Sequence, residues 1–102
     1  MAELICIGSL RDMPGEDEAR EFIVAGRVIC VANVGGRLRA LDNVCLHRGG
    51  PLGQGVISAG KVVCPWHGWE FDANTGAAMQ NPSACVAVYP IRIEGEEVLV
   101  EI

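Results

Sequence analysis

Two thiols and two imidazoles stand in a pair of short motifs near the middle of the chain. Cys45 and His47 form a C-x-H motif, and Cys64 and His67 form a C-x-x-H motif. Thiolate sulfur and imidazole nitrogen are both common ligands of transition metals. The sequence has no other histidine. If a metal centre uses both, none remains for a mononuclear iron site with two histidines or for a Ser-His-Asp triad.

Two kinds of metal centre use two thiolates and two imidazoles. One is a tetrahedral structural zinc site, and the other is a [2Fe–2S] cluster in which two histidines replace two cysteines on one iron. Zinc sites of this composition usually take both cysteines from one element and both histidines from another. Each motif here supplies one of each, which favours the two-iron cluster. A zinc-stabilised β interaction module without redox function is the alternative.

The elements that must position these motifs are predicted to be short antiparallel strands. Apolar runs rich in Val and Ile are punctuated by Gly, and no segment has the long 3.6-residue period of an amphipathic helix. The predicted strands are residues 4–7, 21–25, 27–34, 37–41, 56–58, 61–63, 69–72, 84–93 and 98–102. Gly35-Gly36 and Ala59-Gly60 are the predicted hairpin turns. The second hairpin returns the chain to the end that it left, so both motifs should meet at one end of an all-β fold.

With their neighbours, the two motifs resemble the Rieske family. The similar segments are residues 45–52 (CLHRGGPL) and 64–72 (CPWHGWEFD), and the likeness extends to Gly76, to Pro82 and to the closing strands. The resemblance implies a single domain, residues 1–102, of small antiparallel sheets. A cluster-binding subdomain at about residues 43–75 would be inserted in a β base of about residues 1–42 and 76–102.

The resemblance also implies one [2Fe–2S] cluster and its ligands. Cys45 and Cys64 would bind the inner iron, and His47 and His67 would bind the outer iron near solvent. The exposed imidazoles should lose protons more readily in the oxidised state, so the reduction potential should fall as the pH rises. Pro82 is expected to cap the cluster from a third loop or to serve as a turn residue.

Respiratory bc-type Rieske proteins carry a disulfide between the two loops and a hydroxyl donor to the cluster. The corresponding positions here are Gly50 and Trp66 for the disulfide and Trp69 for the hydroxyl. Fewer hydrogen bonds to the sulfurs leave the added electron less stabilised. We therefore expect a reduction potential of about −150 mV rather than about +300 mV, in the lower part of the Rieske range.

The Rieske domains of ring-hydroxylating oxygenases are also similar, but those enzymes need a further iron on two histidines and a carboxylate. The resemblance therefore implies a Rieske-type ferredoxin, an electron-transfer protein rather than an enzyme. It would carry one electron from a flavoprotein reductase to a terminal enzyme, with a ring-hydroxylating oxygenase as the expected acceptor. The alternative within the family is a small Rieske subunit held in a larger oxidoreductase such as a nitrite reductase.

The composition fits a small protein that binds neither nucleic acid nor membrane. The 102 residues are half hydrophobic and carry a net charge of −5, whereas nucleic-acid binders are normally basic. No apolar run approaches the 18 or so residues that span a membrane. The first residues lack a basic, apolar leader, and five cysteines cannot all pair within the chain. We expect a cytoplasmic monomer that contacts its partners weakly.

The remaining candidates lie around the motifs or in the strands. Residues 22–69 carry a charge of +4 between acidic flanks, and Arg48 in this part is a candidate partner contact. Trp66 and Trp69 flank His67 and are expected either to shield the cluster or to be ordinary core aromatics. Three cysteines in apolar strand contexts are predicted to be buried structural thiols: Cys6, Cys30 and Cys85.

Overall fold

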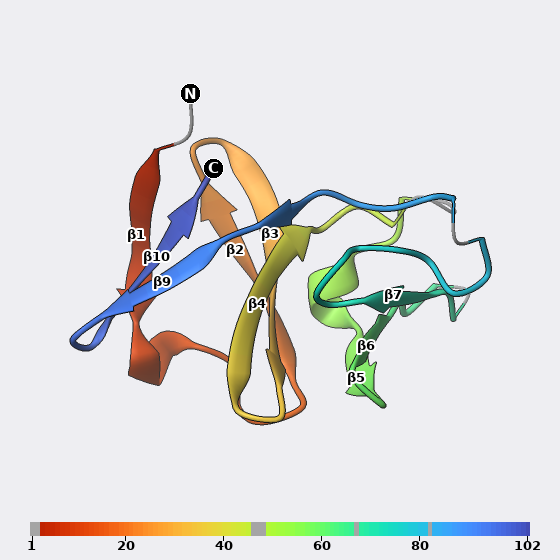
Figure 1. Cartoon of the computed structure of the whole chain (residues 1–102), viewed down its shortest axis with the longest axis horizontal. Coiled ribbons are helices and arrows are strands. Elements are labelled where there is room, and N and C mark those ends of the chain that lie inside the picture. Colours follow the sequence, from red (N-terminus) through yellow and green to blue (C-terminus); the bar gives the residue numbers. More distant parts are fainter. Residues whose placement is uncertain (1–2, 46–48, 67, 82) are drawn as a thin grey trace.

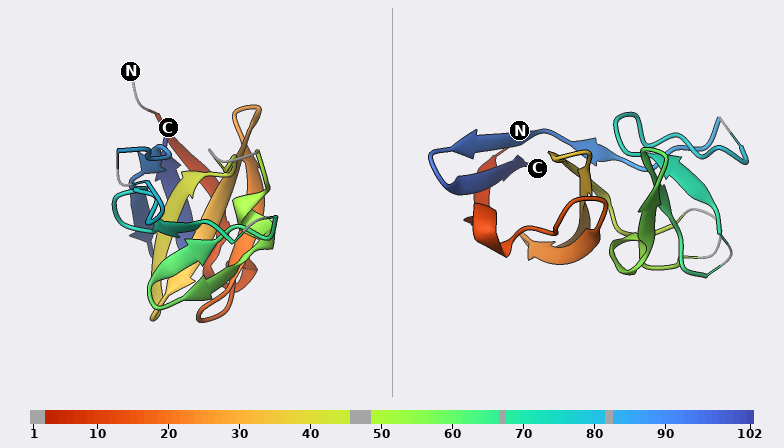
Figure 2. Two further views of the ribbon diagram at one scale, coloured as in Figure 1. Left: turned by 90° about the vertical axis from the view of Figure 1, so that its right-hand side faces the viewer. Right: turned by 90° about the horizontal axis from the view of Figure 1, so that it is seen from below.

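Short antiparallel strands in three sheets make up the fold, as a computed structural model of the chain shows (Figure 1). The structure describes residues 3–45, 49–66, 68–81 and 83–102. Two of the sheets curve around a common interior, and the third lies to one side of them (Figures 1 and 2). The all-β prediction is confirmed, with two short 3-10 turns, η1 (Leu10–Asp12) and η2 (Leu52–Gln54), as additions that the sequence did not indicate.

The central sheet has the order β2-β3-β4-β8. Its strands are β2 (Ala19–Val24), β3 (Arg27–Val34), β4 (Arg37–Asp42) and β8 (Val88–Tyr89). The hairpin between β3 and β4 turns at Gly35 and Gly36, whose φ angles are 60° and 90°. A two-residue turn of this kind needs positive φ at both central positions, which glycine adopts at no steric cost. The predicted turn is therefore confirmed.

The second sheet has the order β1-β10-β9, with β1 (Leu4–Ser9), β10 (Glu97–Glu101) and β9 (Ile91–Glu94). The prediction of one strand over residues 84–93 is wrong. The chain leaves the central sheet after β8 and enters the second sheet at β9, with Pro90 between them. Proline has no N–H for a sheet ladder, so it suits the point where a strand changes sheets. Its carbonyl still accepts the N–H of Glu101 at 2.9 Å.

The third sheet is small and has the order β5-β6-β7. Its strands are β5 (Val56–Ser58), β6 (Lys61–Val63) and β7 (Glu70–Asp72). The predicted turn between β5 and β6 is confirmed, since Ala59 and Gly60 both have positive φ. Pairing of Val56 with Val63 closes the open end of this hairpin. The segments before β5 and after β6, which hold the two motifs, are thus brought to the same end of the hairpin.

Strand β3 divides the interior into two cores because successive side chains of a strand point to opposite faces. Ile29 and Val31 pack in one core with Val98 and Val100 of β10. Cys30 and Ala32 pack in the other core with the third sheet, represented by Phe71. Cys45 and Cys64 belong to this second core, so the candidate ligand thiols are part of the packed interior that joins the sheets.

The cysteines outside the motifs differ in exposure. Cys30 is fully buried, as predicted, but Cys6 and Cys85 are exposed, so the prediction is wrong for these two. In β1 the side chains that pack on the core are Ile5 and Ile7, and Cys6 between them points outward by strand alternation. Next to Cys85, it is the side chain of Val86 that is buried. No helix in the described part of the chain is long and apolar enough to cross a membrane.

Candidate metal centre

The loop that begins at Cys45 is held by two main-chain hydrogen bonds. The N–H of Cys45 donates to the carbonyl of Gly50 at 2.9 Å, and the N–H of Gly49 donates back to the carbonyl of Cys45 at 2.7 Å. Gly49 has a φ of 75°, a left-handed conformation that glycine adopts without the strain of a side chain. The loop is therefore a closed frame with the cysteine at its first position and a glycine at its fifth.

The loop that begins at Cys64 repeats the same frame. The N–H of Cys64 donates to the carbonyl of Trp69 at 2.8 Å, and the N–H of Gly68 donates to the carbonyl of Cys64 at 3.1 Å. Gly68 also has a φ of 75°. The two motifs differ by one residue in the spacing of cysteine and histidine, yet both cysteines occupy the first position of one backbone frame.

The structure brings the two motif thiols into contact. Cys45 and Cys64 are 1% and 3% exposed, and their thiols are hydrogen-bonded to each other. Burial raises the pKa of the Cys64 thiol, and the Cys45 thiol raises it further, while the N–H of Trp66 donates to the Cys64 sulfur and opposes this rise. Metal binding requires the thiolate, so a metal would have to replace these protons. Two adjacent buried sulfurs, one with an amide donor, fit a pair of thiolate ligands on one iron.

Gly50 allows the close approach of the two loops. A Cβ added at Gly50 would lie 2.6 Å from Sγ of Cys64, closer than real Cβ atoms come, and 3.1 Å from Cγ of Trp66. Gly50 and Trp66 are the positions that the resemblance relates to the disulfide of bc-type proteins. All five cysteines here are free thiols. The contact between the Trp66 ring and the bare Gly50 backbone joins the two loops without a covalent bond.

The other two predicted ligands lie outside the described residues. His47 and His67 belong to this group, as do Arg48 and Pro82, so the structure tests none of the roles expected for them. Of the four candidate ligand side chains, the structure thus describes the two cysteines, and it places them together.

A third loop with the same frame was not anticipated from the sequence. The N–H of Asp72 donates to the carbonyl of Ala77 at 2.9 Å, and the N–H of Gly76 donates to the carbonyl of Asp72 at 2.7 Å. The Asp72 carboxylate accepts the N–H groups of Asn74 at 2.8 Å and Thr75 at 3.2 Å. An available signal was the glycine four residues after each first position, at Gly49, Gly68 and Gly76.

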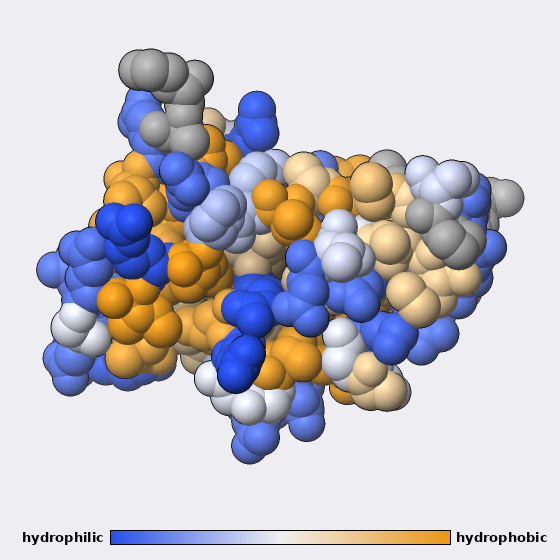
Figure 3. All heavy atoms as spheres, viewed as in Figure 1, coloured by the Kyte–Doolittle hydropathy of each residue, from blue (hydrophilic) through white to orange (hydrophobic). Residues whose placement is uncertain are grey.

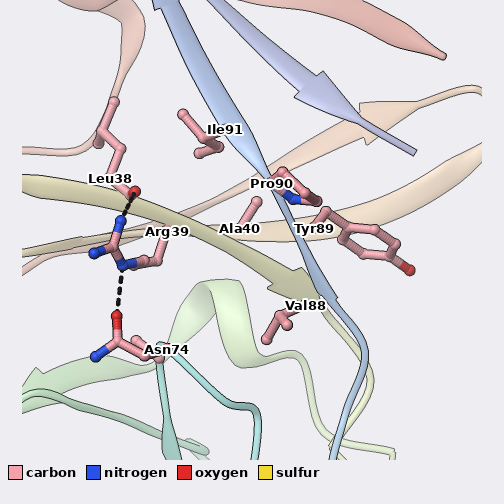
Figure 4. A pocket seen from close by; sticks show the side chains of 9 residues that line it. Leu38, Arg39, Ala40, Asn74, Val88, Tyr89, Pro90 and Ile91 are labelled. Atoms are coloured by element: carbon pink, nitrogen blue, oxygen red, sulfur yellow. Dashed lines mark hydrogen bonds between the residues drawn. The ribbon is translucent and has the colours of Figure 1, made fainter. Parts of the chain in front are cut away.

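An open pocket of about 380 Å³ lies between β4, the start of β9 and the third loop (Figure 4). The Nε of Arg39 donates to the side-chain oxygen of Asn74 at 2.6 Å along its wall. Neither motif cysteine lines this pocket, so it is separate from the candidate metal centre. On the face shown in Figure 3, hydrophobic side chains gather among hydrophilic neighbours over the second sheet. Leu4 of β1 and Ile93 of β9 are exposed.

Comparison with known families decides what kind of centre these thiols belong to. The family model for the Rieske [2Fe-2S] domain matches residues 3–90. The chain belongs to the Rieske [2Fe-2S] family. This membership favours the two-iron cluster over the zinc-stabilised module, which was the alternative drawn from the donor set.

Relatives of this Rieske protein include ferredoxins. The ferredoxin component of a naphthalene 1,2-dioxygenase system from Pseudomonas aeruginosa is 30% identical over 95 residues, which cover 92% of this chain and 90% of the relative. A ferredoxin of carbazole 1,9a-dioxygenase from Nocardioides aromaticivorans IC177 has a solved structure that is 28% identical, with a TM-score of 0.86 and 95% of each chain covered.

A further solved structure supports the fold alone. It is a complex of reduced oxygenase and oxidised ferredoxin in carbazole 1,9a-dioxygenase, 24% identical with a TM-score of 0.83, covering 95% of this chain and 91% of that one. Nearly the whole length of this Rieske protein is therefore shared with proteins named as ferredoxins.

Proposed function

We propose that this Rieske protein carries single electrons from a flavoprotein reductase to the oxygenase of a ring-hydroxylating system. The observation that carries the proposal is the contact of the buried Cys45 and Cys64 thiols, in a chain that spans nine-tenths of a dioxygenase ferredoxin component. The sequence holds only two histidines. Its own residues can therefore hold the cluster but cannot also build the mononuclear iron site of an oxygenase.

The proposed ligands are Cys45 and Cys64 on one iron and His47 and His67 on the other. The cluster, when bound, accepts one electron and gives it up again. The residues around it bind the metal, exclude water from the two sulfurs and present one N–H to the Cys64 sulfur. The proposed cluster-binding subdomain, about residues 43–75, contains both loops and the sheet of β5, β6 and β7. The rest of the chain forms the base.

The proposed partner surface is the end of the molecule that bears the two loops. Val44 and Trp66 are 52% and 55% exposed, although each lies next to or near a buried cysteine. Exposed apolar side chains beside a redox centre suit a contact that forms quickly and leaves again, as a shuttle requires. We further propose that the protein is a monomer in the cytoplasm, where reducing conditions keep the exposed Cys6 and Cys85 thiols free.

Reconstitution tests the carrier function directly. The purified chain is combined with NADH, a flavoprotein reductase and the oxygenase of a ring-hydroxylating system, and the hydroxylated product is measured. Product should form only when the chain is present, and the Cys64→Ala variant should not replace it. Product formation without the chain would contradict the proposal. Gel filtration separates the two roles within the family, because a permanent subunit would elute with its larger partner and a shuttle would elute alone.

A further inference from the structure

A buried polar network ties the first ligand loop to strand β2. Asn43 is 5% exposed and is the buried polar side chain in the described part of the chain. Its amide group donates to the Glu21 carboxylate at 2.6 Å, and the Gln54 amide donates to the same carboxylate at 3.0 Å. Glu21 lies in β2 and the two amides lie at the two ends of the loop. One carboxylate therefore receives a hydrogen bond from each end of the segment that contains Cys45.

Asn43 also closes this segment on itself. Its side-chain oxygen accepts the N–H of Gly53 at 2.7 Å, and its main-chain carbonyl accepts the N–H of Leu52 at 2.8 Å. Asn43 stands two residues before Cys45 and thus fixes both the departure and the return of the loop. Buried amides that are hydrogen-bonded hold one geometry strongly, because each broken bond leaves an unsatisfied group away from water.

The approach between β2 and this segment is too close for a side chain at Gly53. A Cβ there would lie 2.5 Å from Cγ of Glu21 and 2.8 Å from the side-chain oxygen of Asn43. The contact between β2 and this segment therefore depends on Glu21, Asn43 and Gly53 together. The Glu21 charge also reaches the interior, since it adds to the main effect of burial in raising the pKa of the Cys30 thiol to about 12.

We propose that Asn43, held by Glu21, is a positioning residue for Cys45. It keeps the first loop in the frame that sets the Cys45 sulfur against the Cys64 sulfur, and so governs how firmly the protein retains its cluster. This inference rests on the proposed function, because it assumes that the two cysteines bind the cluster. An asparagine could instead support the fold by its hydrogen bonds alone, without acting on the cluster. A second asparagine of the chain distinguishes these two roles.

Asn33 provides the matched control. Its side chain likewise donates one hydrogen bond, here to the main-chain carbonyl of Pro14 at 3.0 Å, and accepts one main-chain N–H, that of Gly36 at 2.9 Å. It stands beside the hairpin turn of β3 and β4, outside the ligand loops. Asn43→Ala and Asn33→Ala therefore each remove one donated and one accepted side-chain hydrogen bond, and only the first should affect the cluster.

The experiment measures iron release from the holoprotein to an excess of an Fe²⁺ chelator after reduction, together with the EPR g-values of the reduced cluster and the melting temperature. We expect Asn43→Ala to speed iron release about tenfold or more and to shift the g-values. Asn33→Ala should lower the melting temperature and leave both cluster readouts at their wild-type values. Equal release rates in the two variants would overturn the inference.

A double variant tests the network itself and remains informative if Asn43→Ala fails to fold. Asn43→Asp alone places two carboxylates together and should release iron quickly. Combined with Glu21→Gln, it restores one donor and one acceptor between the two positions, and the Gly53 N–H keeps its acceptor. The double variant should return to within about twofold of the wild-type release rate. Failure of this rescue would overturn the inference, whereas a wild-type chain without a [2Fe–2S] spectrum would overturn the proposed function instead.

Discussion

The loops that begin at Cys45 and Cys64 share their backbone frame with the loop that begins at Asp72. In each loop the first residue donates its N–H to the sixth residue and accepts an N–H from the fifth, which is a glycine with a φ of 75° to 80°. The loops differ in the side chain at the first position. The carboxylate of Asp72 is filled by two N–H groups of its own loop, whereas the two thiols are turned to each other in the core.

Comparing the three loops separates the role of the shared backbone frame from the role of the side chain at its first position. In two of the frames, main-chain N–H groups donate to the first side chain: those of Asn74 and Thr75 to the Asp72 carboxylate, and that of Trp66 to the Cys64 sulfur. A carboxylate satisfies the frame by itself, and the loop is then purely structural. Under the proposed function, the two adjacent thiols would instead bind a metal as thiolates. We infer that the chemistry of each loop depends on its first residue rather than on its backbone.

The largest effect should follow from removing that first side chain. Cys45→Ala and Cys64→Ala should each abolish cluster binding, because one iron would lose a thiolate. Iron and acid-labile sulfide per chain should fall to less than about a tenth of the wild-type content. Asp72→Ala has the same frame and should keep its full iron content. Loss of the cluster in Asp72→Ala as well would contradict the assignment of metal binding to the two cysteine loops alone.

A buried thiol outside the frames gives the next largest contrast. Burial, with a smaller contribution from Glu21, raises the pKa of Cys30 from 9.0 to about 12. At pH 8 its thiolate fraction should be about a thousandfold lower than that of a thiol of ordinary pKa. Iodoacetamide applied to the folded protein should therefore modify the exposed Cys6 and Cys85 long before Cys30, as peptide mass spectrometry would show. Modification of all three at similar rates would contradict this assignment.

The same shift gives a pH dependence with a defined sign. The unfolded chain ionises Cys30 near pH 9.0, but the folded chain does so only near pH 12. The unfolded state therefore holds fewer protons between these values, and stability falls as the pH rises through this window and is unaffected by this group below it. Urea denaturation at pH 8 and pH 10 should show a smaller loss of stability for Cys30→Ala than for the wild type.

The sequence predicted some elements of the fold correctly and others not. Strand β3 and its Gly35-Gly36 turn were predicted to the residue because an apolar run and a turn signal agree there. The strand over residues 84–93 was wrong because the local pattern is apolar on both sides of Pro90, while the sheet changes there. The contact of Glu21 with Asn43 joins residues 22 positions apart, and no local pattern reports such a tertiary contact.

The motif cysteines were predicted as a pair, but their loop frame was not. The spacing of Cys64 and His67 indicated metal ligands, since few other arrangements explain two such motifs. The shared frame depends on main-chain hydrogen bonds, whose only trace in the sequence is a glycine at the fifth position. The exposure of Cys6 was wrong for a related reason. Apolar neighbours predicted a buried strand, but the side of the strand that faces the core is set by its pairing with β10.

The fifth-position glycines should differ in how much they tolerate a side chain. A Cβ at Gly76 would lie 2.1 Å from the main-chain oxygen of Val86, whereas no atom of the described residues beyond the chain neighbours lies within 4 Å of a Cβ at Gly68. Gly68→Ala should cost about 1 kcal/mol for the left-handed conformation alone. Gly76→Ala should cost about 3 kcal/mol or more, because a clash with the backbone is added. Urea denaturation of the holoproteins measures both, and equal losses would mean that the two frames do not differ in their surroundings.

The smallest effect should come from the carboxylate of the third loop. Asp72→Ala removes the acceptor of the Asn74 and Thr75 N–H groups, which water can partly replace because both residues are exposed. The cost should be about 1 kcal/mol, as for the loss of a capping side chain. Asp72→Asn keeps one acceptor oxygen and should recover about half of this loss in the same denaturation experiment. If Asp72→Ala leaves stability unchanged, the carboxylate does not support its frame, and the three loops would share a backbone pattern without sharing the need for an anionic first residue.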